Sequence, residues 1–276
     1  MATESLAELV RFVPDVYGFR YANHVAMFIV TSAGVILVDP IGQVNWRTPA
    51  LMKEAIRAVT AEPVRYVVYS HSAFDHSTGG AVFADTARFV GHANAVKPIK
   101  AANDPTTPAP DITFDAKTSL ELGGRRVDLY PADLSPTDDY IVVHDGAARV
   151  AMFVDLVQPR NAPFRTLLGH PDRILERFRW IEDNLDFDVI VSGHATPQMS
   201  GTKQDIMEQR RYHEDLGDAI ATAHAVGLAD ASPEMTTLVR SLMHPKYGAW
   251  RRFDEFLALN IQGMIAWRAG QSPSAH

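Results

Sequence analysis

The stretch that most constrains the fold is a short apolar run, of the kind found in buried strands, that ends abruptly in polar side chains. Residues 66–69 read Tyr-Val-Val-Tyr, and the segment that follows carries His71, Asp75 and His76 before a Ser-Thr-Gly-Gly break. Short continuous apolar runs are typical of buried strands in α/β proteins, whose ligand sites form just beyond the strand ends. Imidazole and carboxylate groups both bind first-row metals. The stretch therefore predicts a strand that leads into a metal site, with a simple polar turn as the alternative.

Composition narrows the class of protein. With 276 residues and 46% hydrophobic content, the chain can bury a substantial core. A net charge of −7 argues against nucleic-acid binding, and the absence of cysteine excludes disulfides, a thiolate nucleophile and a cysteine-based zinc site. No apolar run approaches the ~20 residues of a transmembrane helix. Residues 1–8 carry Glu4 and Glu8 and lack the basic start of a signal peptide.

From these features we expect a soluble, cytoplasmic protein with a small-molecule substrate. It is expected to bind neither nucleic acid nor membranes, and a homodimer is an open alternative to a monomer.

Apolar patterns along the chain predict a mixture of strands and helices. The first predicted element is a hairpin of residues 24–30 and 35–39, around a turn whose Gly34 supplies a positive φ. Helices are expected to begin at Thr48-Pro49 and at Pro171, and the chain after about residue 201 shows helical periodicity. Further strands are expected at residues 66–69, 87–90, 126–130, 140–144, 148–154 and 188–193. This order of elements indicates an α/β fold.

Metal-capable side chains follow three of the predicted strands. His71, Asp75 and His76 follow the first, Asp155 follows residues 148–154, and His194 follows residues 188–193. Each of them alone would usually be a turn or cap residue. Strand ends in one sheet can meet at a common edge, so the three groups together predict one site.

At this point the sequence resembles the metallo-β-lactamase-fold superfamily, including its glyoxalase II-like and lactonase-like hydrolases, over about residues 22–200. The resemblance implies an α/β fold, a four-layer αβ/βα sandwich of two mixed sheets, for residues 1–200. Residues 201–276 are then a C-terminal helical extension packed on the same domain. The resemblance rests on Asp39-Pro40, on His71-Ser72-Ala73-Phe74-Asp75-His76 against the signature H-x-H-x-D-H, and on Ser135-Pro136-Thr137-Asp138, Phe153-Val154-Asp155-Leu156 and Ser192-Gly193-His194.

The first of the family's two metal sites is incomplete in this chain. The second signature histidine is replaced by Ala73, which cannot bind a metal. The third histidine of the family falls on Leu134, or on Asp133 if one residue is inserted, and the sequence leaves both alternatives open. The resemblance leaves this site only His71 and the shared Asp155.

The family's second metal site is retained in full. The resemblance implies that Asp75, His76, Asp155 and His194 bind one divalent metal, with zinc as the family default and iron or manganese as alternatives. His71 is then free to transfer protons, so the candidate catalytic residues are His71 and Asp75. The alternative for His71 is a supporting or packing role.

Three functions remain open from the sequence. The first is a metallo-β-lactamase-fold hydrolase that acts on an ester, lactone or similar acyl substrate with a single metal in the second-metal site. The second is a lyase or isomerase on the same fold, suggested by the loss of half of the hydrolytic site. The third is a catalytically inactive homologue that binds a small molecule. Substrate identity depends on loops and extensions and does not follow from the fold.

Overall fold

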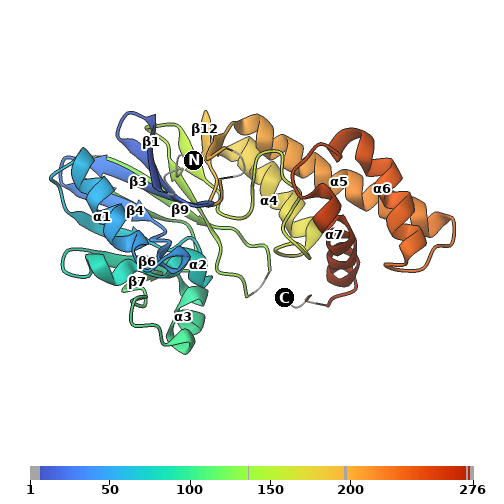
Figure 1. Cartoon of the computed structure of the whole chain (residues 1–276), viewed down its shortest axis with the longest axis horizontal. Helices are drawn as coiled ribbons and strands as arrows, with labels where there is room; N and C mark the ends of the chain where they lie inside the picture. The colour runs from blue at the N-terminus through green and yellow to red at the C-terminus, as the bar shows by residue number, and fades with distance from the viewer. Residues whose placement is uncertain (1–6, 136, 196–197, 272, 274–276) are drawn as a thin grey trace, which may run out of the picture. The chain divides into compact units, whose positions relative to one another are not determined.

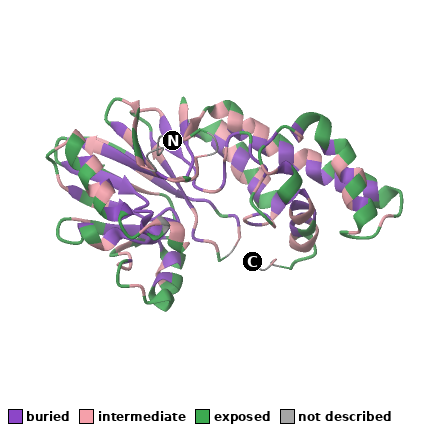
Figure 2. Cartoon of the chain, viewed as in Figure 1, coloured by how far each residue is buried: buried purple, intermediate pink, exposed green. Residues whose placement is uncertain are grey.

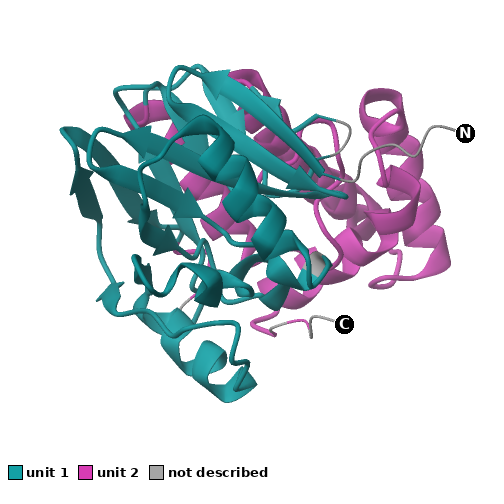
Figure 3. Cartoon of the chain, turned by 60° about the vertical axis from the view of Figure 1, so that its left-hand side comes forward, with its two compact units in different colours: residues 1–132, 137–154, 186–201 teal, residues 133–136, 155–185, 202–276 magenta. Residues whose placement is uncertain are grey.

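The computed structural model describes residues 7–135, 137–195, 198–271 and 273. The chain divides into two compact units, coloured separately in Figure 3. The first unit comprises residues 1–132, 137–154 and 186–201, and the second comprises residues 133–136, 155–185 and 202–276. The N-terminal residues 1–6, which bear on the signal-peptide expectation, and Pro136 of the family motif lie outside the described residues.

Within the described residues, the first unit contains a seven-stranded mixed sheet. Strands β1 to β4 are antiparallel neighbours and β4 to β7 are parallel neighbours. The predicted hairpin is confirmed as β3 and β4, and Gly34 at its turn has a φ of 144°. In sheet order the strands are β1 (Ala7–Val13), β2 (Val16–Tyr21), β3 (His24–Thr31), β4 (Gly34–Val38), β5 (Val64–Val68), β6 (Arg88–His92) and β7 (Ile112–Phe114).

Strands β1 and β2 precede the hairpin, so the prediction that the hairpin is the first element is wrong. β1 lies at the sheet edge, where three of its seven residues are exposed and the other four are partly buried, which weakens its apolar pattern. Gly18 interrupts the apolar pattern of β2. A glycine leaves room at this position for the ring of Phe12, because a Cβ would lie 2.5 Å from it. An edge strand and a glycine both reduce the periodic signal from which strands are predicted.

A six-stranded sheet completes the first unit in the part of the chain that the structure describes. The strands predicted at residues 140–144 and 148–154 are present as β10 and β11, which are antiparallel neighbours. β12 adds to β11 in parallel. In sheet order the strands are β13 (Ser200–Gly201), β12 (Val189–Val191), β11 (Val150–Met152), β10 (Ile141–Asp145), β9 (Arg125–Pro131) and β8 (Thr118–Leu122).

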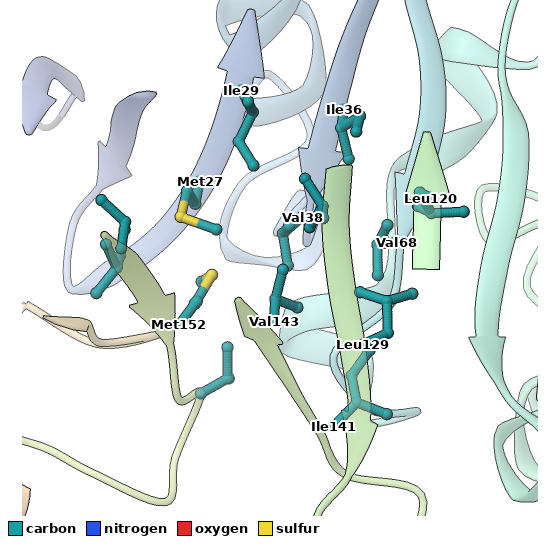
Figure 4. Packing of buried hydrophobic residues seen from close by; sticks show 14 of the residues in the cluster. Met27, Ile29, Ile36, Val38, Val68, Leu120, Leu129, Ile141, Val143 and Met152 are labelled. Carbon is teal, nitrogen blue, oxygen red and sulfur yellow. The ribbon is translucent and has the colours of Figure 1, made fainter. Parts of the chain in front are cut away.

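The two sheets share one hydrophobic core. Figure 4 shows Met27, Ile29 and Val38 of the first sheet facing Val143 and Met152 of the second. Buried aliphatic side chains of this kind each stabilise the fold by about 1.5–3 kcal/mol relative to exposure.

Strand β3 is buried on both of its faces. Met27 and Ile29 point into the core between the sheets, while Ala26 and Phe28 point to the opposite face. Successive strand residues point to opposite faces, so a strand buried on both sides is a continuous apolar run. This is why its sequence does not alternate.

Helices cover the outer face of the first sheet, as Figures 1 and 2 show for α1 and its buried side. Met52 and Ile56 of α1, Phe83 and Ile99 pack against the side chains of that face. The helix expected at Thr48-Pro49 is confirmed as α1. The helical segments of this unit are η1 (Gly42–Val44), α1 (Thr48–Val59), α2 (Phe74–Ser77), η2 (Gly80–Phe83), η3 (Ala93–Ala95) and α3 (Val96–Ala102).

The second unit is helical in its described residues. The helix predicted at Pro171 is confirmed, and the chain after residue 201 forms three helices as expected. Thr202 and Asp205 form a capping box at the start of α5, which satisfies backbone N–H groups of the first turn. The helices are α4 (Pro171–Asn184), α5 (Lys203–Ala225), α6 (Pro233–Tyr247) and α7 (Phe253–Arg268). None of the described helices is long and apolar enough to cross a membrane.

Candidate metal centre

The candidate site lies where parallel strands of the first sheet end. Asp39 follows β4, and Ser70 and His71 follow its parallel neighbour β5. The carboxyl ends of parallel neighbours meet at one sheet edge, which brings these side chains together. Helix α2 begins just beyond and carries Asp75 and His76. The predicted strand that leads into a polar cluster is therefore present.

Asp39 is fully buried and fixes the orientation of His71 through Ser70. One carboxylate oxygen, Oδ1, accepts a hydrogen bond from the Ser70 backbone N–H at 2.8 Å, and Oδ2 accepts one from the Ser70 hydroxyl at 2.7 Å. Because the hydroxyl proton points to Asp39, the Ser70 oxygen accepts from Nδ1 of His71, 2.9 Å away. The Nδ1–H tautomer leaves a lone pair on Nε2 of His71, the form that a base or a metal ligand needs.

His71 is held by packing as well as by Ser70. Its ring is 2% exposed and stacks on Tyr140, with ring centroids 4.3 Å apart and an interplanar angle of 14°. The His76 ring centroid lies 5.0 Å away. His71 is thus a fixed imidazole beside the metal-capable residues.

The same carboxylate also approaches His76. Nδ1 of His76 lies 3.2 Å from Oδ2 of Asp39, and both side chains are fully buried. This contact turns Nδ1 of His76 toward Asp39 and leaves Nε2 on the side of the cluster. One buried carboxylate therefore contacts His76 directly and His71 through Ser70, an arrangement that orients histidines toward a metal.

Four side chains of the first unit converge around Nε2 of His76. The four residues are His24, Asp75, His76 and His194, and each offers one possible metal-ligand atom. These atoms all lie within 4.8 Å of one another. Nε2 of His76 lies 3.2 Å from Nε2 of His194 and 3.6 Å from Oδ2 of Asp75. Oδ2 of Asp75 lies 3.1 Å from Nε2 of His24. The Asp75 side chain is 35% exposed, whereas that of His24 is 14% exposed and that of His76 is fully buried.

Backbone pairing places His194 in this cluster. His24 and His194 form an antiparallel bridge, and the N–H of Val25 donates to the carbonyl of Gly193 at 2.8 Å. Gly193 has no room for a side chain, because a Cβ would lie 2.5 Å from Val154 and 2.9 Å from Cε1 of His76. The glycine of the Ser-Gly-His motif thus permits the close approach of His194 to His76.

Burial lowers the pKa of His24 below its ordinary value of 6.5. The hydrogen bond to Asp75 acts in the opposite direction, while the neighbouring His194 and His76 lower the pKa further. The two neighbouring imidazoles disfavour positive charge on the His24 ring. Near neutral pH this keeps the His24 ring neutral, which is the form that binds a metal.

The donor set of the cluster fits a divalent transition metal. Nε2 of His76 lies 3.2 Å from Nε2 of His194 and 3.6 Å from Oδ2 of Asp75. Imidazole nitrogens and a carboxylate at this spacing can share a proton or a divalent cation. Ligand atoms around a tetrahedral zinc ion lie about 3.3 Å apart, given bonds of about 2.0–2.1 Å, and the spacings here are close to that value. The site therefore meets the chemical requirement for a metal.

Three predicted site residues, Asp75, His76 and His194, are brought together in the first unit. Asp155 belongs to the second unit, directly after Val154, and has a φ of 60°. Its place among the ligands stays a prediction.

The two alternatives for the third family histidine also belong to the second unit. Asp133 forms an ion pair with Arg177, and Leu134 is fully buried, with its carbonyl accepting a hydrogen bond from the His170 N–H. Leu134 carries no ligand atom, and the charge of Asp133 is already paired. Nearby in the sequence, Asp139 accepts a hydrogen bond from the Ser72 N–H at 2.8 Å, which supports the loop before α2.

His24 is one of two site residues that the sequence did not predict. It begins an apolar strand and has no partner at metal-ligand spacing along the chain, so only the β3 pairing brings it to His194. Ser70 was also missed, since one hydroxyl in a polar loop carries no signal by itself. The Asp39-Pro40 pair was noted in the family resemblance, and the structure shows its role in orienting His71 and His76.

Comparisons with known proteins agree with this geometry. A family model described as the metallo-β-lactamase superfamily matches residues 21–194. A search of curated proteins finds no match. A structure of a double mutant of the sec-alkyl sulfatase PisA1 is similar, with 14% identity and a TM-score of 0.75, over 96% of this chain and 50% of that one. A metallo-β-lactamase from Pontibacter korlensis is also similar, with 18% identity and a TM-score of 0.61, over 75% of this chain and 99% of that one.

The sec-alkylsulfatase Pisa1 from Pseudomonas sp. gives a TM-score of 0.71 at 13% identity, over 94% of this chain and 49% of that one. The chain therefore spans about half the length of the alkylsulfatase chains that it matches. These likenesses confirm the predicted fold class.

Proposed function

Because this chain belongs to the metallo-β-lactamase superfamily, we propose that it is a metal-dependent hydrolase of an ester, lactone or similar acyl substrate that uses a single metal. The observation that carries the proposal is the convergence of Asp75, His76 and His194, with Nε2 of His76 3.2 Å from Nε2 of His194 and 3.6 Å from Oδ2 of Asp75. At the position of the second signature histidine, Ala73 offers no ligand atom. One of the two family metal sites is thus supported by the side chains, and the other is not.

Asp75, His76 and His194 would hold the ion, and Asp155 is a further ligand by the family pattern. The bound ion would supply Lewis-acid activation of water or of a substrate carbonyl. Zinc is the family default, and a mixed imidazole and carboxylate set also suits iron or manganese. Asp39 contributes by holding the His76 ring with Nε2 toward the cluster.

We assign proton transfer to Nε2 of His71. The chain from Asp39 through Ser70 keeps the proton on Nδ1 and the lone pair on Nε2. When Nε2 takes a proton, the buried Asp39 carboxylate stabilises the resulting imidazolium through the Ser70 hydroxyl. Tyr140 stacks on the ring and prevents it from rotating away. His71 therefore has the fixed position that general acid–base catalysis requires.

A second substrate class comes from the structural likeness. The alkylsulfatase structures align over nearly the whole of this chain, including the part beyond residue 201, whereas the Pontibacter β-lactamase covers 75% of it. This favours sulfate esters as the second class to test. Acyl esters and lactones stay first, because the described side chains of the cluster support one metal and a base.

The test combines metal analysis with a substrate screen. Protein purified without chelator should contain about one divalent ion per chain and should hydrolyse members of an ester, lactone or sulfate-ester panel. Removal of the ion by chelation should abolish turnover, and its return should restore it. Two tightly held ions per chain would contradict the single-metal proposal. Products of elimination or isomerisation would show a lyase or isomerase, and metal-loaded protein that binds panel members without turnover would show an inactive homologue.

A further inference from the structure

His24 is aimed at the metal-capable cluster although it belongs to no motif of the family signature. Its Nε2 lies 3.1 Å from Oδ2 of Asp75, and its ring centroid lies 4.6 Å from that of His194 and 5.5 Å from that of His76. We propose that His24 is a metal ligand, so that His24, Asp75, His76 and His194 together bind one ion. This rests on the proposed metal-dependent function and adds a ligand to it.

The position of His24 is set by backbone structure on both sides of the ring. The bridge between His24 and His194 is flanked by two hydrogen bonds of 2.8 Å, from Val25 N–H to Gly193 O and from Ala195 N–H to Asn23 O. Both histidines therefore stand side by side at one strand end, with their Cα positions fixed by the sheet. A ligand on a strand is held more precisely than one on a loop.

The polar contacts of the His24 ring are made through Nε2, which faces the cluster. Its Nδ1 is buried and has no hydrogen-bond partner among the residues that the structure describes. A histidine kept for structural reasons is usually tied by its second nitrogen to a carbonyl or carboxylate, as His213 is tied to the Gln209 carbonyl at 2.8 Å. The cluster is therefore the interaction that explains where the His24 ring points.

A third imidazole also changes the preferred ion. The family pattern places two imidazoles, His76 and His194, on the retained metal. His24 raises the number to three, beside the carboxylate of Asp75. Imidazole-rich sets select zinc, cobalt, nickel, copper or iron over magnesium, calcium and manganese. The class of ion that we infer is thus an imidazole-favouring transition metal.

The competing explanation is that His24 only donates an N–H to the Asp75 carboxylate. Two substitutions separate the two roles. His24→Ala removes both the ligand and the donor. His24→Asn retains an N–H donor on a short side chain but offers no imidazole nitrogen. His144→Ala is the matched control, since His144 lies on β10 of the same unit and bonds to the Asp186 carbonyl.

The measurement uses metal-free full-length protein. Zn²⁺ affinity is determined by competition with a chromophoric chelator, and the visible spectrum of the Co²⁺-loaded protein reports the ligand set. We expect both His24 variants to lose more than about 100-fold in Zn²⁺ affinity, beyond the ~10–100-fold typical of residues that merely support a ligand. Their Co²⁺ spectra should differ from that of the unmodified protein, while His144→Ala should match it.

Retention of affinity within about tenfold, with an unchanged Co²⁺ spectrum in both variants, would overturn the assignment of His24 and leave the proposed function standing. The same holds if His24→Asn behaves as the unmodified protein and only His24→Ala is weakened, since His24 would then be a hydrogen-bond donor to Asp75. Unmodified protein that binds neither Zn²⁺ nor Co²⁺ would overturn the proposed function as well. Circular dichroism of the metal-free variants checks that they fold.

Discussion

Buried polar side chains occur in both units, but they are satisfied in different ways. In the second unit the fully buried Asn260 has a partner for each of its polar atoms. Its Nδ2 donates to the carbonyls of Pro163 and Arg165, at 2.9 and 2.6 Å, and its Oδ1 accepts from the Tyr212 hydroxyl at 2.8 Å. Nε2 of Gln209 likewise donates to the carbonyls of Gln158 and Asn161. Each donor in this network meets an acceptor.

The cluster of the first unit has the opposite arrangement. Nε2 of His76 faces two groups that can each act as an acceptor, the Asp75 carboxylate and Nε2 of His194. A closed network of donors and acceptors specifies a structure, whereas acceptors that face one another need a further proton or cation. This difference separates the closed network of the second unit from the cluster of the first unit, for which we propose a metal ion.

The largest effect is expected when a ligand is removed from the cluster. His76→Ala and His194→Ala should each lose most of the bound metal and all measurable turnover together, because each removes an imidazole that the structure places at the centre of the cluster. Elemental analysis and initial rates on the same samples check this. His144→Ala is the control and should keep both. A His76→Ala protein that retains its metal and activity would show that the cluster is structural after all.

The next effect separates proton transfer from metal binding. His71→Ala should keep most of the metal, because His71 has lost its family partner at Ala73, but its kcat should fall by about 10²–10⁴-fold, the usual size of a general acid–base contribution. The loss should appear in kcat more than in substrate binding. Steady-state kinetics with metal analysis decide the matter. Normal turnover would make His71 a packing residue, and loss of the metal would return it to the ligands.

The sequence predicted those parts of the fold that depend on local pattern. The β3–β4 hairpin, the strand before His71 and helix α4 each have periodicity or turn chemistry of their own, and the structure contains all three. Gly34, for example, occurs where a turn needs a positive φ. Strands β1 and β2 were missed because an edge position and Gly18 weaken their patterns.

The candidate site was predictable only as far as its motif. Asp75, His76 and His194 follow predicted strands, and their convergence follows from strand ends that share a sheet edge. His24 is different, since it lies at the start of its strand and reaches the site through pairing with a segment 170 positions later. Such long-range register is set by the packing of the whole sheet. No local spacing could have indicated it.

A smaller effect should result from opening the second unit's closed network. Asn260→Ala removes three hydrogen bonds and leaves the carbonyls of Pro163 and Arg165 and the buried Tyr212 hydroxyl without their partner, which should lower the free energy of unfolding by about 3 kcal/mol. Metal content should not change. Urea unfolding followed by tryptophan fluorescence measures the loss. The control Asn184→Ala removes one exposed bond to the Trp180 carbonyl and should cost about 0.5 kcal/mol or less. Equal effects of the two substitutions would show that the network around Asn260 is not a stability determinant.

The smallest effect concerns pH and the buried histidine of the same network. Burial lowers the pKa of His213 from 6.5 to about 4, and its Nδ1–H donates to the Gln209 carbonyl. Above pH ~6.5 His213 is neutral in both the folded and unfolded chains and has no effect on the pH dependence. Between about 6.5 and 4 the unfolded chain binds a proton that the folded chain does not, so stability falls as the pH falls through this window.

Between about pH 7.5 and pH 5 this linkage amounts to about 2 kcal/mol, since one pKa unit corresponds to about 1.4 kcal/mol. His213→Gln removes the titrating group, so its free energy of unfolding should decline by about 2 kcal/mol less than that of the unmodified protein over the same range. The exposed His224 on α5 provides the control, and His224→Gln should follow the unmodified protein. Urea unfolding at both pH values gives the comparison. Parallel pH dependences of His213→Gln and the unmodified protein would contradict the prediction, because His213 would then take up its proton in the folded state as readily as in the unfolded chain.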